Sequence, residues 1–432
     1  MNRFTLAALA AAALAFGAPA AAQEAAAAPG AAPQQTPEEK KKLEEQIAKE
    51  LGVSPAAPAL PPAEGAPPGI TAPGVPEQTP GGAPAPPQAV QGQVGGNPFA
   101  RLMMLPDISA IGDFAGVYDS RDTGNESPRS GPVSAPHQLT PVFQELELGI
   151  QSVIDPYARA DIFISFEPSG VSVEEAYMTT LALPFGLQAR AGKFYSPFGR
   201  LNQQHPHVWD FVDAPLALDR LVSASQLGGP GVDVAWLAPL PWFAEFHLFG
   251  QTTTPAFEDK EQRTLGGRVL QYFDVGDAAA LGVGLSAARI EEPVFGSWRD
   301  LGGADVHLKL RPPWTRSYLV LQGEAFVRRL TAPSVPDQTD WGGYAQALWR
   351  DGPYFAYGAR YDFAPAFQNG RIGIVQVDGT EHRLSAIASW FPSEFQKVRL
   401  QGAWDRLPGG QNGLELILQL EFVIGAHGAH PF

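Results

Sequence analysis

Cysteine is absent from the 432 residues, which excludes disulfides, thiolate nucleophiles and cysteine-ligated zinc. Long hydrophobic runs are also missing: after residue 22, no stretch stays apolar for the roughly 20 residues that a transmembrane helix requires. Lysine and arginine are fewer than the acids, 30 against 45, and the formal net charge is -15. This balance argues against nucleic acid as a partner, because surfaces that bind nucleic acid need basic patches.

The first 22 residues have the pattern of a secretory signal peptide. Arg3 precedes an alanine-rich apolar run, and the run ends in small residues just before Gln23. A helical membrane anchor is the alternative, but the run is short and contains Gly17 and Pro19 near its end. We therefore expect export from the cytoplasm and removal of residues 1–22.

Residues 23–96 are dominated by alanine, proline, glycine and glutamine. Such a composition cannot bury a core, and we expect a disordered periplasmic tether. Thr36 as an N-cap, Pro37 at the first helical position and Gly52 just past the end predict one short helix over 37–51. That helix is either solvated or self-associating, and the tether would be the part that binds a cell-wall or periplasmic partner.

From about residue 105 the sequence repeats short segments in which apolar and polar residues alternate. Short turns such as Asp351-Gly352 alternate with longer links such as 364–380. Outer-membrane barrels have short periplasmic turns and long extracellular loops, and they must be closed because lipid offers backbone amides no partner. The predicted fold is an all-β, transmembrane, antiparallel up-and-down β-barrel of about sixteen strands within 97–432. The strands are expected at 108–118, 142–154, 157–167, 171–183, 186–195, 230–238, 242–251, 264–274, 278–289, 303–311, 316–328, 341–350, 353–363, 381–391, 394–405 and 413–425.

The last segment shows which face should meet lipid. One side carries Leu414, Leu416, Leu418, Leu420, Phe422 and Ile424, and the other carries Glu415, Gln419 and Glu421, with Ile417 and Val423 as exceptions. Charges on many polar faces suit a wet lumen with a lipid-facing exterior, whereas a soluble barrel hides its apolar face inside. At sixteen strands side chains cannot fill the interior, so an aqueous channel is expected.

The longest connection, 196–229, is expected to narrow this channel, by its resemblance to the third loop of general porins. Its apolar residues, such as Trp209 and Phe211, suit a loop packed against an inner wall. Arginines on one wall facing carboxylates would orient dipolar solutes. The predicted constriction residues are Lys193, Arg200, His205, His207, Asp210, Asp213 and Arg220, and the predicted lumen wall is Glu145, Glu147, Arg159, Asp161, Arg190, Arg360, Arg383 and Arg399.

Two resemblances concern residues 143–220. Gly192-Lys193-Phe194 followed by Pro197-Phe198-Gly199 resembles the phosphate-selective porins. The runs ELELGIQSVIDPYARADIFISF, VSVEEAYMTTLALPFGLQARAGKF and FGRLNQQHPHVWDFVDAPLAL look like proteobacterial proteins named zinc-regulated TonB-dependent outer membrane receptors. The second resemblance implies a link to zinc and to energised uptake.

His205 and His207 flank Pro206, and their imidazoles are suitable zinc ligands. The alternative is that both histidines only hydrogen-bond the loop to the wall. The sequence contains no GxSxG nucleophile motif and no HExxH motif, so we expect neither an enzyme nor a cofactor.

These observations predict a porin-type channel for passive diffusion of small hydrophilic solutes or ions in the outer membrane of a Gram-negative bacterium. Outer-membrane lipid is the expected surrounding, and a homotrimer is one expected assembly. Two alternatives remain open at this point. One is selective uptake of metal ions or metal complexes, and the other is a structural barrel that tethers the outer membrane to the cell wall.

Overall fold

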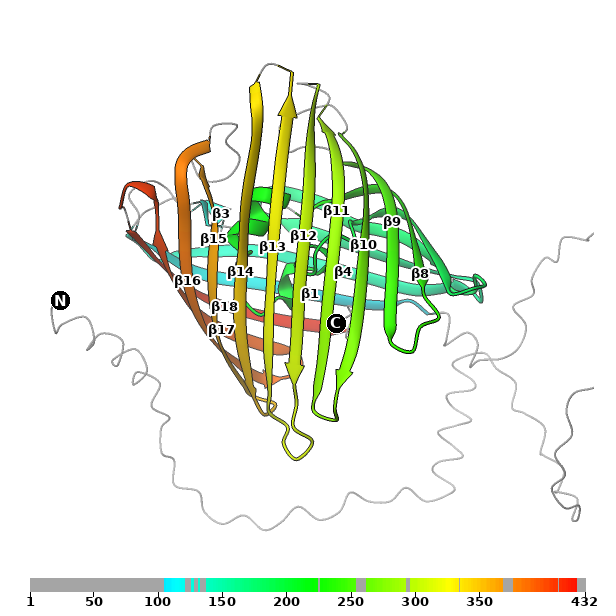
Figure 1. Ribbon diagram of the computed structural model, residues 1–432. Coiled ribbons are helices and arrows are strands. Elements are labelled where there is room, and N and C mark those ends of the chain that lie inside the picture. The colour runs from blue at the N-terminus through cyan, green and yellow to red at the C-terminus, as the bar shows by residue number, and fades with distance from the viewer. Residues whose placement is uncertain are drawn as a thin grey trace, which may run out of the picture. The chain divides into compact units, whose positions relative to one another are not determined.

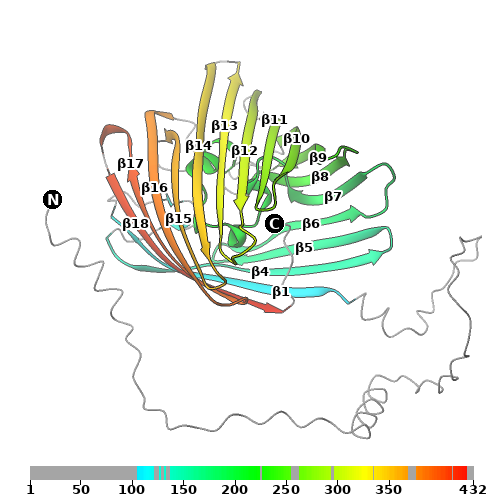
Figure 2. The same cartoon turned by 60° about the horizontal axis from the view of Figure 1, so that its bottom comes forward.

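In the computed structural model, the strands between Asp107 and Gly425 form a closed ring (Figures 1 and 2). The structure describes residues 105–120, 126–127, 131–132, 137–223, 226–253, 262–292, 296–333, 335–367, 376–410 and 412–425. The predicted signal peptide, the tether 23–96 and the helix 37–51 lie outside these residues. Within the described part of the chain, no helix has the length and apolar character needed to cross a membrane.

Sixteen antiparallel strands form one closed barrel, which confirms the predicted fold class. Each strand pairs with its neighbours in the sequence, and β1 pairs with both β4 and β18, which closes the ring. A separate two-stranded ribbon, β2 (Glu126–Ser127) with β3 (Gly131–Pro132), lies in the first long connection. The barrel strands are β1 (Asp107–Asp119), β4 (Thr140–Asp155), β5 (Ala158–Glu167), β6 (Gly170–Thr180), β7 (Leu187–Tyr195), β8 (Gly228–Leu237), β9 (Phe243–Thr253), β10 (Gln262–Val275), β11 (Ala279–Glu292), β12 (Ser297–Leu310), β13 (Tyr318–Ala332), β14 (Val335–Asp351), β15 (Phe355–Phe367), β16 (Gln376–Ser393), β17 (Gln396–Arg406) and β18 (Asn412–Gly425).

The two faces of the barrel wall are inverted relative to a soluble protein. In β18, Leu414, Leu416, Leu418 and Leu420 are exposed, whereas Glu415, Gln419 and Glu421 are buried. Successive side chains of a strand point to opposite faces, so the leucines cover the outside and the polar groups face the interior. An apolar exterior of this kind suits contact with lipid.

Several strands begin earlier than the sequence pattern indicates. β12, β14 and β16 start at 297, 335 and 376, where 303, 341 and 381 were expected. Most of residues 329–340, which lie between the expected strands 316–328 and 341–350, are also strand. Many of the extra residues are polar, and some form ion pairs across strands, as in Arg329 Nη2 to Asp337 Oδ2 at 2.6 Å. Apolar alternation indicates only the lipid-facing part of a strand, so extensions with solvated ion pairs escape it.

Candidate pore constriction

The connection between β7 and β8 runs inside the ring of strands (Figure 2). It contains three short helical turns: η1 (Leu201–Gln203), η2 (Pro206–Val208) and η3 (Leu218–Val222). Every residue from 201 to 222 is buried or half-buried, although the segment is a connection and not part of the wall. We refer to residues 201–222 as the inner loop.

A glycine turn directs the chain into the lumen. Gly199 has a φ of 64°, in the left-handed region that side chains with a Cβ rarely adopt. A Cβ there would lie 2.5 Å from Glu324 Oε2 of β13. That carboxylate accepts hydrogen bonds from the backbone nitrogens of Arg200 at 2.7 Å and Leu201 at 2.9 Å. The start of the inner loop is therefore fixed to the wall through its backbone.

The middle of the inner loop is held by buried charges. Asp213 accepts hydrogen bonds from Arg360 Nη2 of β15 at 2.7 Å, from Gln401 Nε2 of β17 at 2.6 Å and from Arg383 Nη1 of β16. Arg360 Nη1 also donates to the Asp213 carbonyl oxygen at 3.0 Å. Asp213, Arg360 and Arg383 are each about 1% exposed. We refer to Asp213, Arg360, Arg383 and Gln401 as the arginine latch.

The arginine latch sets the pH behaviour of the loop. Burial raises the pKa of Asp213, but the charges of Arg360 and Arg383 outweigh it, and the pKa falls below its usual 3.8. The carboxylate therefore stabilises the docked loop fully above pH 3.8, and this contribution is lost as the pH falls through the lowered pKa.

We expect the channel current to stay constant from neutral pH down to about 4, because Asp213 remains ionised over this range. Below that value the current should rise as Asp213 becomes protonated. The rise follows because protonated Asp213 no longer offsets two buried guanidinium groups. Single-channel recording across this range measures the effect. In an Asp213→Asn variant the acid step should disappear, and a wild-type step of unchanged size in this variant would contradict the assignment.

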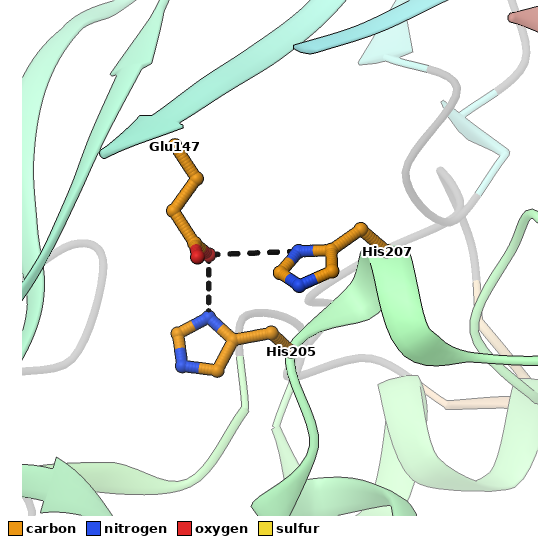
Figure 3. A group of neighbouring side chains, drawn as sticks. All are labelled: Glu147, His205 and His207. Carbon is orange, nitrogen blue, oxygen red and sulfur yellow. Dashed lines mark ion pairs between the residues drawn. The ribbon is translucent and has the colours of Figure 1, made fainter. Parts of the chain in front are cut away.

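The beginning of the inner loop meets the wall at Glu147, Glu174, Glu175, His205 and His207, which we call the histidine cluster. Figure 3 shows three of these residues, Glu147, His205 and His207. Pro206 favours extended backbone in the residue before it, and His205 has φ -60° and ψ 143°. Its Nδ1 lies 2.7 Å from Glu147 Oε2 of β4 and 2.9 Å from Glu174 Oε2 of β6. His207 Nδ1 lies 3.6 Å from the same Glu147 oxygen, with the two imidazole centroids 5.7 Å apart.

Burial alone would lower the pKa of His205. The charge of Glu147 and hydrogen bonds with Glu147, Glu174 and Glu175 outweigh burial, and they raise this pKa well above the usual range of histidine. The cluster can therefore hold either a proton on His205 or a metal cation in its place, since imidazole and carboxylate are both metal ligands.

Apolar wall residues receive the rest of the inner loop. Phe211 and Val212 belong to a buried cluster with Ile387 of β16 and Ile417 of β18. Ile417, an exception in the predicted alternation, faces inward and forms part of this seat. A second buried cluster joins Leu216, Leu218 and Leu221 of the inner loop to one residue from each of six wall strands. These wall residues are Phe249 on β9, Ile290 on β11, Leu301 on β12, Phe326 on β13, Tyr344 on β14 and Ala364 on β15. Inward-facing apolar residues are thus a sequence signal for a packed loop.

The structure gathers most, but not all, of the predicted constriction residues. Asp210 accepts a hydrogen bond from Gln346 Nε2 at 3.0 Å, and Arg220 Nη2 lies 2.6 Å from Glu381 Oε2. Arg200, His205, His207 and Asp213 also contact the wall. Lys193 is apart from them: it is exposed, and its Nζ donates to the Val173 carbonyl oxygen.

The predicted lumen-wall residues divide into two groups. Glu147, Arg360, Arg383 and Arg399 contact the inner loop directly, Arg399 through the Trp209 carbonyl oxygen at 2.7 Å. The others bond within the wall: Arg159 with Asp161, Arg190 with Asp233 at 3.3 Å, and Glu145 with Ser165 at 3.4 Å. Many arginines thus pair with nearby carboxylates, which weakens the transverse field that the sequence suggested.

Two acids of the histidine cluster, Glu174 and Glu175, were not among the predicted site residues. Consecutive residues of a regular strand face opposite sides of the sheet, so the alternation would place only one of Glu174 and Glu175 in the lumen. The register between β5 and β6 shifts after Phe163, which pairs with Glu175, while Ile164 pairs with Val173. Glu174 is the extra residue of this β-bulge, and the bulge turns both carboxylates toward His205.

Comparison with known proteins adds one relative in sequence and several in fold. No family model matches the chain. A protein of Aquifex aeolicus (strain VF5), described as uncharacterized, is 33% identical over 393 residues, which cover 78% of this chain and 82% of that protein.

The similar solved structures include outer-membrane porins and channels. An anion-selective porin from Comamonas acidovorans aligns with a TM-score of 0.53 and 13% identity, over 74% of this chain and 99% of that one. OprB of Pseudomonas putida aligns with a TM-score of 0.53 and 10% identity, over 76% of this chain and 95% of that one. The channel DcaP of Acinetobacter baumannii aligns with a TM-score of 0.51 and 10% identity, over 74% of this chain and 97% of that one. At these identities the likeness is one of fold.

Proposed function

We propose that this protein is a porin-type channel in the outer membrane. The chain belongs to the same protein family as the Aquifex aeolicus protein, and it has the barrel fold of porins. Small hydrophilic solutes or ions would diffuse through the barrel of 97–432, with loop 196–229 as the constriction. Residues 1–22 would direct export, and residues 23–96 would form the periplasmic tether. One observation carries the proposal: the inner loop, without an exposed residue, is fixed inside a barrel of porin size.

The attachment of the inner loop around the barrel supports a narrow path. Its wall partners come from strands far apart in the ring, so the loop occupies much of the cross-section. These partners are Glu147 on β4, Glu175 on β6, Glu324 on β13, Gln346 on β14, Arg360 on β15, Glu381 on β16 and Gln401 on β17. The loop side chains that keep partial exposure are mainly polar, including Gln203, Gln204, Asp210 and Arg220, and they suit contact with the remaining water.

The charge of the interior supports a preference for cations. Among the described residues, the fully buried charged side chains are seventeen aspartates and glutamates against four arginines, and half-buried bases such as Arg190, Arg220 and Lys397 pair with some of these acids. A lumen lined by acids raises the local concentration of cations and repels anions. We therefore propose weak cation selectivity for this channel.

Removal of the inner loop tests the constriction. Replacing residues 201–222 by a short glycine–serine linker should raise single-channel conductance several-fold in planar bilayers, because a sixteen-stranded barrel without an inner loop leaves a wide aqueous channel. The wild-type protein should give a smaller, ohmic current with a reversal potential that favours cations.

The matched control shortens a different connection. Removing residues 408–410, the turn η4 between β17 and β18, leaves the inner loop in place and should leave the conductance unchanged. Equal conductance of wild type and inner-loop deletion would contradict the constriction, and absence of current in both would contradict the channel.

The alternatives rest on fewer observations. Uptake of metal ions would need a site open to the path, whereas His205 and His207 are only 2% and 3% exposed. That burial favours a resident ion over a transported one. A cell-wall attachment concerns the tether outside the described residues, and a homotrimer remains our proposal for the assembly.

A further inference from the structure

The histidine cluster has the donor set of a metal site. Glu147, His205 and His207 each offer one ligand atom, and these three atoms lie within 4.8 Å of one another. All three side chains are buried. Ligand atoms in tetrahedral zinc sites lie about 3.3 Å apart, as follows from metal–ligand distances of about 2.0–2.1 Å. The two distances from Glu147 Oε2, 2.7 Å to His205 Nδ1 and 3.6 Å to His207 Nδ1, lie on either side of this value.

An outer carboxylate orients the first histidine. Glu175 Oε2 lies 2.8 Å from His205 Nε2, and its other oxygen, Oε1, accepts a hydrogen bond from the Tyr195 backbone nitrogen at 2.7 Å. A hydrogen bond from Nε2–H to Glu175 leaves Nδ1 of His205 as the ligand atom, facing Glu147. Histidines that bind metals almost always donate their other ring nitrogen to a group of this kind.

The local charge also favours a cation. Three carboxylates, those of Glu147, Glu174 and Glu175, lie within 2.9 Å of one imidazole. A protonated His205 supplies one positive charge to this group, whereas a divalent cation bound by neutral imidazoles supplies two. Glu174 Oε2 lies 2.9 Å from the same Nδ1 and adds a negative charge beside these three ligands.

We propose that Glu147, His205 and His207 bind a divalent transition-metal cation of the zinc class. Two ligands come from the inner loop and one from the wall strand β4, so the ion clamps the loop to the barrel. Glu175 is a positioning residue, because it holds the His205 ring and does not bind the ion. The clamp rests on the proposed constriction, since it would hold the loop that narrows the channel.

The test is zinc binding to the full-length protein, refolded in detergent and freed of metal by chelator. Isothermal titration with Zn²⁺ should show one equivalent, and Co²⁺ in its place should give the visible absorption of a tetrahedral ion. His207→Ala should abolish this stoichiometric binding. Glu175→Gln should weaken it by about 10–100-fold, the usual effect of losing an outer partner.

His307→Ala is the matched control, because His307 is a histidine of β12 that faces the same lumen but lies outside the histidine cluster. It pairs with Gln322 of β13, whose side-chain oxygen accepts a hydrogen bond from Arg200 Nε. This variant should bind zinc like the wild type. Since substitutions in the cluster can impair folding, each variant is first checked for the heat-dependent gel mobility of a folded barrel. No stoichiometric binding by the folded wild type, or binding retained in folded His207→Ala, would overturn the site.

The effect on current separates this proposal from the channel itself. Adding chelator to a wild-type channel should increase the conductance or its fluctuations, and zinc should reverse the change. Stoichiometric zinc without any effect on current would overturn the clamp and leave the channel intact. Conductance that does not respond to deletion of the inner loop would instead overturn the constriction, whatever the zinc titration shows.

Discussion

Replacing Asp213 by alanine is expected to release the inner loop and to raise single-channel conductance toward that of the loop deletion. The substitution leaves the guanidinium groups of Arg360 and Arg383 buried after removal of a carboxylate that both contact. Breaking a buried ion pair by removing one partner costs about 3–5 kcal/mol. That cost reduces the population of the docked loop, relative to the undocked loop, by a factor of roughly 100 to 4,000.

The effect should be specific to the loop. Arg360 and Arg383 keep their wall partners, Asp362 at 2.8 Å and Asp405 at 2.6 Å, so the barrel itself should remain folded. Conductance and protease sensitivity of the inner loop measure the release. Low, wild-type-like conductance in a folded Asp213→Ala barrel would show that the arginine latch does not hold the loop.

Asp210→Ala is the matched control for this prediction. Asp210 lies three residues away in the same loop, but it is half-buried and bonds a neutral amide, Gln346 Nε2, at 3.0 Å. Losing one hydrogen bond to a carboxylate costs about 1.5–3 kcal/mol, which is less than the cost of breaking the buried ion pair. The loop should therefore remain docked, and the conductance should change little.

Leu418→Arg is expected to destabilise the barrel by about 2–4 kcal/mol, the cost of an arginine at the lipid-facing midplane of an outer-membrane barrel. Leu418 is central in β18 and 54% exposed on the outer face. The physical reason is that the guanidinium would enter hydrocarbon, which cannot solvate its charge. Urea unfolding in lipid vesicles, followed by tryptophan fluorescence, measures the free energy of unfolding.

Leu414→Arg provides the comparison, because it changes the same residue type on the same face near the end of the strand. Its cost should be about 0–1 kcal/mol, as found near the membrane interface. Equal and small costs at both positions would show that the leucine face does not meet hydrocarbon, whereas a gradient from 418 to 414 supports the membrane-embedded barrel.

The histidine cluster was only partly predictable. His205 and His207 were candidates because their side chains suit metals, and Glu147 was expected on the lumen wall. Nothing in the spacing joins residues 147 and 205, which are brought together by the path of the inner loop through the barrel. The contribution of Glu174 depends on the β-bulge after Phe163, and strict alternation cannot anticipate a bulge.

The sequence by itself determined the barrel. Alternation of leucines with polar residues, as in 413–425, requires a strand with one apolar face, and turn spacing determines which strands are neighbours, so the count of sixteen follows. Tertiary structure alone decided how the inner loop is held. Asp213 meets Arg360 and Arg383 across 147 and 170 residues of sequence, and such contacts leave no local pattern, because they depend on closure of the ring around the loop.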